Sequence, residues 1–96
     1  MRHKSIRPSH PAEIIADSLE ALGVSKVAAA RSLGISRNTL YSLLDRKQGV
    51  TAAMALRLEA VLGSTAETWL SLQAAHDLWL ARQNLDVTQL RPIEAA

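Results

Sequence analysis

The chain has no cysteine, no phenylalanine and few aromatic residues of any kind, 3% in all. Without cysteine it can form neither a disulfide framework nor a thiolate metal site. No apolar run approaches the length that spans a bilayer, and the polar start MRHKSIR is not followed by the apolar core of a signal peptide. We therefore expect no membrane segment and a cytoplasmic protein.

What the chain does contain is alanine and leucine at helical spacing. Hydrophobic residues make up 48% of the 96 residues, enough to bury a core. Val, Ile and Thr nowhere alternate with polar residues as they would in a half-buried strand. We predict one all-α domain over 10–84, preceded by a flexible basic arm, 1–9, and followed by a tail, 85–96.

The stretch 26–45, KVAAARSLGISRNTLYSLLD, predicts two short helices joined by a tight turn. Ala30 is small where crossing helices would touch, and Gly34 can end the first helix in the left-handed conformation. Ile35 would fill the angle between the helices, and Ser36 could cap the second helix. This combination is typical of a helix-turn-helix, whose second helix enters the DNA major groove.

The second of these helices divides into an inner and an outer side. Leu40, Leu43 and Leu44 repeat at helical spacing and would face the core. The outer side then carries Arg37, Asn38, Tyr41 and Ser42. Arg and Asn are the side chains that bond bidentately to guanine and adenine edges, so we expect base contacts from this side.

Basic residues gather around the same motif. The stretch 26–47 holds five basic residues and one acid, whereas 11–25 holds three acids and no basic residue. A phosphate backbone would be attracted to the motif and to the basic arm. We expect phosphate contacts from Lys26 at the start of the first motif helix, and from Arg46 and Lys47 directly after the second.

Three further helices are predicted, over 11–22, 52–62 and 66–84. The first of them, 11–22, carries an apolar stripe that ends at Leu22 and would pack against the core. Thr51 can cap the second, and Gly49 would give the preceding turn its backbone freedom. Before the third, Ser64 and Glu67 have the spacing of a capping box.

The last of these helices carries two apolar stripes where an ordinary surface helix has one. One contains Trp69, Leu72, His76 and Trp79, and the other contains Leu70, Ala74, Leu78 and Ala81. Both tryptophans could complete the core of one protomer. Because Trp is enriched at the centres of interfaces, we favour a homodimer contact. Its residues would be Trp69, Leu72, Leu78 and Trp79.

The sequence shows no catalytic or metal-binding pattern. His3, His10 and His76 have no spacing that brings two of them onto one helix face. The serines that precede helices are better explained by capping than by nucleophilic catalysis. We therefore expect no enzymatic activity, no metal, no cofactor and no small-molecule ligand.

Three stretches carry a resemblance to a known family. They are RPSHPAEII at 7–15, LGISRNTLYSLLDRKQGVTAAMALRLEAVLG at 33–63, and TWLSLQAAHDLWLAR at 68–82. The helix-turn-helix resembles the XRE/Cro type, and the first and last stretches are similar to the HigA-type antitoxins of bacterial toxin–antitoxin pairs. The resemblance implies a five-helix, lambda-repressor-like domain.

The resemblance also implies partners and contact residues. Such proteins form homodimers, bind a palindromic operator in their own promoter, and bind a RelE-like toxin that cleaves messenger RNA. Carried over to this chain, Ser36, Arg37, Asn38 and Tyr41 would contact bases and Thr39 phosphate. One departure is Lys26, where the family often has Gln; a lysine can meet the phosphate as a point charge.

The acids of the first predicted helix suggest a surface for that toxin. Glu13, Asp17 and Glu20 would lie on its outer side. They could be ordinary solvated surface, but an RNA-binding toxin presents basic residues that acids complement. Two alternatives remain open at this point: a phage-like repressor without a toxin, and a protein-interaction module in which the helix-turn-helix is only a scaffold.

Overall fold

A computed structural model describes residues 7–94, in which the regular elements are five helices and no strands. They are α1 (Pro11–Leu22), α2 (Lys26–Leu33), α3 (Arg37–Leu44), α4 (Ala52–Leu62) and α5 (Ala66–Asn84). The all-α prediction is confirmed; the spans of α1, α4 and α5 agree with their predictions, and α2 and α3 lie within the predicted stretch 26–45. Of the expected basic arm, residues 1–6 lie outside the described part of the chain.

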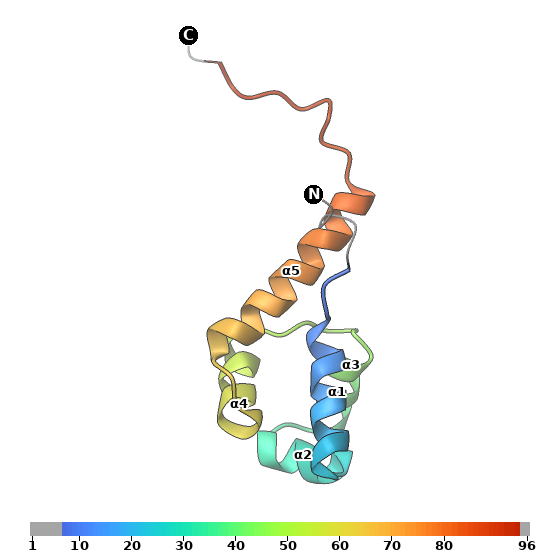
Figure 1. The fold of residues 1–96 in the computed structure, drawn as a ribbon, viewed down its shortest axis with the longest axis vertical. Coiled ribbons are helices and arrows are strands. Elements are labelled where there is room, and N and C mark those ends of the chain that lie inside the picture. The colour runs from blue at the N-terminus through green and yellow to red at the C-terminus, as the bar shows by residue number, and fades with distance from the viewer. Residues whose placement is uncertain (1–6, 95–96) are drawn as a thin grey trace.

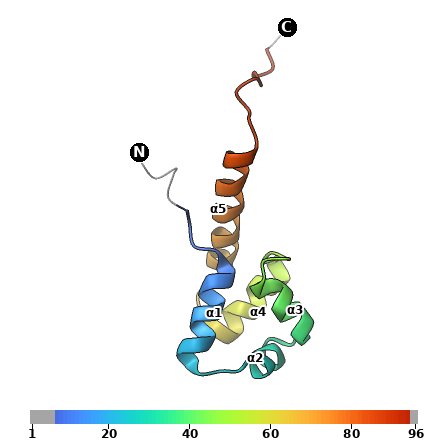
Figure 2. The same cartoon turned by 90° about the vertical axis from the view of Figure 1, so that its right-hand side faces the viewer.

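Helices α1 to α4 form the body of the molecule, and α5 projects from it. In Figures 1 and 2, α1 to α4 cluster together, and α5 begins beside α4 and extends away from the cluster. The described part of the expected tail, residues 85–94, continues outward from α5 without a helix or strand. None of the described helices is both long and apolar enough to cross a membrane.

Side-chain caps fix where three of the helices begin. Ser25, Ser36 and Thr51 each accept a hydrogen bond from a backbone N–H in the first turn of α2, α3 and α4, which confirms the caps predicted at Ser36 and Thr51. At the other end, Gly23 and Gly34 close α1 and α2 with φ of +68° and +71°. Backbone N–H and C=O groups at the helix ends have no partner within the regular helix, and these caps supply partners from adjacent residues.

The cap of α5 differs from the prediction. Thr65, not Ser64, is the capping residue, and its hydroxyl accepts from the backbone N–H of Thr68 at 3.0 Å. Ser64 lies one residue earlier with φ +61°, so the capping box of Ser64 and Glu67 is wrong. Where several adjacent residues can cap, the path of the chain decides which one does.

A capping box does occur, at the start of α1, where none was predicted. Nδ1 of His10 accepts from the N–H of Ala12 at 2.9 Å, and Oε1 of Glu13 accepts from the N–H of His10 at 3.1 Å. Pro11 occupies the first helical position, where its missing N–H would have no helical partner. Histidine is not among the usual capping residues, which is why the sequence pattern did not reveal it.

The core lies among α1 to α4 and the first half of α5. Its buried residues are Ile15, Leu19, Ala29, Ala30, Leu33, Leu40, Leu43, Val50, Met54, Ala55, Leu58, Ala66 and Trp69. The inner side predicted for α3 is confirmed. The prediction for Leu22 is wrong: it is 63% exposed, because it lies in the last turn of α1, where the chain leaves for α2.

Candidate nucleic-acid interface

The turn between α2 and α3 has the form expected of a helix-turn-helix. Gly34 donates its N–H to carbonyls of the last turn of α2, and Ile35 donates its N–H to the carbonyl of Ala30 at 3.0 Å. Ile35 is partly buried against the core, and Ala30 is buried where the helices meet. The roles predicted for these three residues are confirmed.

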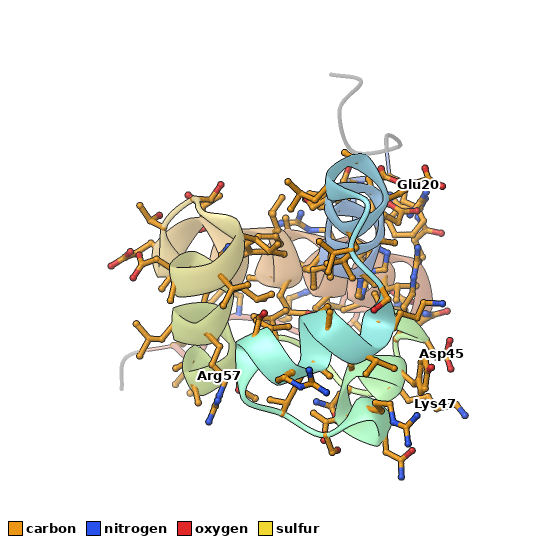
Figure 3. All side chains as sticks on the ribbon, turned by 90° about the horizontal axis from the view of Figure 1, so that it is seen from below. Glu20, Asp45, Lys47 and Arg57 are labelled. Atoms are coloured by element: carbon orange, nitrogen blue, oxygen red, sulfur yellow. The ribbon has the colours of Figure 1, made fainter. Side chains whose placement is uncertain are left out.

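Arg57 of α4 also holds this turn, which the sequence analysis did not foresee. Its Nη1 donates to the carbonyl oxygens of Leu33 at 2.8 Å and Gly34 at 3.2 Å, and Figure 3 shows it on α4 beside α2. The carbonyls at a helix end carry partial negative charge, which the guanidinium stabilises. A Cβ at Gly34 would lie 2.8 Å from this nitrogen, so glycine provides space here as well as a left-handed φ.

The outer side of α3 presents the expected base-contacting residues. Arg37 and Asn38 are exposed in the first turn, and Tyr41, one turn later, is 42% exposed. Ser36 differs, because its hydroxyl accepts from the N–H of Thr39 at 3.0 Å and donates to the Thr39 hydroxyl at 2.9 Å. Both hydroxyls therefore act in the cap, and their contacts with DNA stay predictions.

Lys26 lies beside the same surface. Its Nζ is 5.7 Å from the centroid of the Tyr41 ring, within the range of a cation–π interaction. This contact connects the first residue of α2 with the outer side of α3. A phosphate contact from Lys26 would thus fall next to the base contacts expected from α3.

The loop after α3 carries the other two expected phosphate ligands. Lys47 is exposed, and Arg46 has φ +62°, which is uncommon for a residue other than glycine. The left-handed residue of the loop is therefore Arg46, and the backbone freedom predicted for Gly49 is not what the loop uses. Gly49 instead lies close to α5, since a Cβ there would lie 3.1 Å from Cδ of Gln73 and the amide would have to shift slightly.

Arg46 is paired within the chain. Its Nη2 lies 2.8 Å from Oε2 of Glu13, and Nη2 of Arg7 lies 3.0 Å from the same oxygen. The hydrogen bond from Arg7, with those from the His10 N–H and Arg46, lowers the pKa of Glu13 to about 2. A phosphate contact by Arg46 would have to share its guanidinium with this carboxylate.

Glu13 is consequently an internal counter-ion rather than a free acid. Its two oxygens serve the α1 capping box and the two arginines, so a toxin contact by Glu13, which stays a prediction, would have to compete with these partners. Asp17 and Glu20 remain exposed on α1. Figure 3 shows Glu20 well apart from Lys47 of the basic loop.

The apolar stripes of α5 have different surroundings. Trp69 is 3% exposed, and its Nε1 donates to the carbonyl of Gly63 at 2.9 Å. It belongs to the core of one protomer, so its assignment to the dimer contact is wrong. Leu72 and Trp79 are half-buried and Leu78 is 49% exposed, so the candidate dimer surface narrows to these three.

Two histidines that are distant in sequence meet beside α5. The rings of His10 and His76 are T-shaped, with centroids 4.6 Å apart. Spacing along one helix could not reveal this pair, because the residues come from different elements. No group of three or more potential metal ligands gathers within the described residues, which do not include His3.

Relatives of the chain share this arrangement. No family model matches. Antitoxin HigA-1 of Vibrio cholerae serotype O1 is 40% identical over 84 residues, covering 85% of this chain and 78% of that protein. The regulator YddM of Escherichia coli K12, named as a helix-turn-helix-type transcriptional regulator, is 41% identical over 81 residues, covering 84% of this chain and 86% of that one.

A solved structure agrees with the relatives. The antitoxin GraA, in complex with its operator, superimposes with a TM-score of 0.80 at 38% identity, over 94% of this chain and 95% of that one. These proteins are named as antitoxins and transcriptional regulators, not as enzymes. The chain therefore belongs to the HigA-type antitoxin family of XRE-like helix-turn-helix regulators.

Proposed function

We propose that this protein is an antitoxin that binds a palindromic operator in its own promoter as a homodimer and neutralises an RNase-like toxin. The observation that carries the DNA-binding part is the outer side of α3. Arg37 and Asn38 are exposed in the first turn of a capped helix, with Lys26 and Lys47 on its flanks. Side chains at this position of a recognition helix reach base edges, and flanking lysines neutralise phosphates.

The dimer follows from the geometry of recognition. One protomer has one recognition helix, so it contacts one half-site, and two half-sites would lie about 34–36 Å apart, or a multiple of one turn. The exposed side of α5 around Leu78 is our candidate for the contact between protomers. Relatives solved with operator DNA support the operator as ligand.

A mobility-shift titration tests the DNA-binding part. The protein is mixed with DNA from its own promoter and with a scrambled duplex of equal length, each at several salt concentrations. We expect binding to the promoter to be tighter by about 10³-fold or more, with an affinity that falls steeply with salt. Equal affinity for both duplexes would contradict an operator, and no binding to either would leave the helix-turn-helix as a scaffold only.

The toxin part has support from the antitoxin names of the relatives and from the acids of α1. Asp17 and Glu20 are exposed and are not needed for DNA contact. Charges at the edge of a protein–protein interface mainly change the rate at which the two proteins associate. The double reversal Asp17→Lys and Glu20→Lys should therefore slow association with the product of the neighbouring toxin gene in a salt-sensitive way, and operator binding should stay intact. Unchanged association at low salt would exclude this surface.

A further inference from the structure

A buried glutamine joins α5 to the loop that carries Lys47. Gln73 is 9% exposed, and its Oε1 accepts from the backbone N–H of Val50 at 2.8 Å. Its Nε2 donates to Oδ1 of Asp77, one turn further along α5, at 2.9 Å. The second bond orients the amide, so that its oxygen rather than its nitrogen faces Val50.

The two ends of this loop are held by different helices. The N–H groups of Arg46, Lys47 and Gln48 donate to carbonyls of the last turn of α3. At the other end, the N–H of Val50 donates to Gln73 of α5. The first part of the loop, with Lys47, is therefore bonded to α3, and its end at Val50 is bonded to α5, so a shift of α5 relative to α3 would strain the segment between Lys47 and Val50.

One side of the loop is open, although the Val50 side chain is buried in the core and Arg46 is paired with Glu13. Residues 46–49 border a cavity of about 490 Å³, which Gln73 also lines. The close contact here is with Gln73, whose amide atoms would lie 3.1–3.3 Å from a Cβ at Gly49. Without this side chain, the loop has open space beside it and its Val50 N–H loses a buried partner.

We propose that Gln73 is a positioning residue for DNA binding, which holds loop 46–50 where Lys47 meets a phosphate and makes DNA affinity depend on the position of α5. The inference rests on the proposed DNA-binding function. Leu78 lies on the same helix, little more than one turn after Gln73. A partner that displaces α5 would therefore act on the phosphate contacts through the Gln73–Val50 bond.

Gln73→Leu tests the inference, since leucine fills similar space without an acceptor. Affinity should fall roughly fivefold to tenfold, the size of one hydrogen bond or one ion contact, on operator and random DNA alike. The slope of log affinity against log salt should fall by about 0.9, and the Val50 amide should exchange faster with solvent. Gln83→Leu is the matched control, because Gln83 is exposed on the same helix; it should change none of these.

A polarity swap separates positioning from a loss of stability. Gln73→Glu alone would place a second carboxylate against that of Asp77. The two like charges would repel each other, so DNA binding should weaken. Combined with Asp77→Asn, it recreates the pair in reverse, with an amide donating to a carboxylate that still accepts from Val50. Affinity and salt slope should then return to wild-type values.

The outcomes distinguish this inference from the function on which it rests. If the wild type binds its operator and Gln73→Leu keeps the same affinity and salt slope, the positioning role is overturned and the proposed function stands. If Gln73→Leu does not fold, the single and double charge variants decide in its place. A wild type without DNA binding would overturn both proposals.

Discussion

The α2–α3 pair and α5 are held in the structure by contacts of different range. The caps of α2 and α3 and the turn at Gly34 join residues no more than five positions apart. The middle of α5 is held by contacts with distant residues, such as Gln73 with Val50 and His76 with His10. A recognition unit closed mainly by local contacts, with Arg57 of α4 as its long-range support, can keep its shape while α5 responds to partners.

The two regions also differ in what they expose. α3 buries its leucines and presents Arg37 and Asn38 to solvent. α5 buries Trp69 but leaves Leu78 and Leu80 about half exposed, at 49% and 42%. Exposed polar groups at a helix start suit a nucleic acid, and exposed leucines suit a protein surface, so the two regions are expected to serve different partners.

The largest difference should appear in folding stability. Leu40→Ala in α3 removes a fully buried side chain and should lower the free energy of unfolding by about 2–5 kcal/mol. Leu70→Ala in α5 removes a partly exposed side chain and should cost much less. Denaturant unfolding at one protein concentration measures both. Equal losses would mean that Leu70 is buried in solution and that the contrast between the regions is incorrect.

The next largest effect concerns assembly. Leu78→Asp places a charge at the centre of the candidate dimer surface and should cost about 2 kcal/mol of association, roughly a thirtyfold rise in the dissociation constant. Sedimentation equilibrium measures the shift toward monomer. Glu67→Lys, at an exposed position near the start of α5, is the control. A dimer of unchanged stability in the Leu78 variant would place the interface elsewhere.

The cap of α5 gives a smaller effect with a clear sign. Thr65→Ala removes the hydroxyl that accepts from Thr68 and should lower the free energy of unfolding by about 1 kcal/mol. Ser64→Ala should change it little, because the Ser64 side chain makes no capping bond. Thermal unfolding compares the two. The reverse ranking would restore Ser64 as the cap.

The smallest effect is a pH dependence at the start of α1. Burial, together with the neighbouring His76 and Arg46, lowers the pKa of His10 below its ordinary value of 6.5, although Asp77 and Glu13 act in the opposite direction. The folded state then binds fewer protons than the unfolded chain, so stability should fall as pH decreases below about 6.5. Protonation also removes the Nδ1 acceptor of the cap.

His10→Asn tests this pH dependence, because asparagine keeps a capping oxygen and does not titrate. The free energy of unfolding should decline less in this variant than in the wild type between pH 7 and pH 5. The same decline in both proteins would assign the pH dependence to other groups.

The same difference in contact range determines how much of the structure could be predicted from the sequence. Capping residues and glycines act within one turn of the chain, so the boundaries of α2, α3 and α4 can be predicted from the local sequence. Leucine periodicity likewise located the inner side of α3. These local signals are strong in the region that was expected to contact DNA.

Long-range partners could not be predicted in this way. Arg57 meets Leu33 across 24 residues, and Gln73 meets Val50 across 23. The sequence positions of Glu13, Arg7 and Arg46 likewise do not indicate that both arginines pair with this one carboxylate. The same limit applies to Trp69, since periodicity defines a stripe on α5 but not which part of the stripe the body covers.

The central claim is that the outer side of α3 selects a DNA sequence while the adjoining loop binds phosphate. Affinities of Arg37→Ala and Lys47→Ala for operator and random DNA, measured at one salt concentration, test it most directly. Arg37→Ala should lose about 1–3 kcal/mol on the operator and much less on random DNA, whereas Lys47→Ala should lose the same on both. An equal loss on both DNAs for Arg37→Ala would contradict the claim.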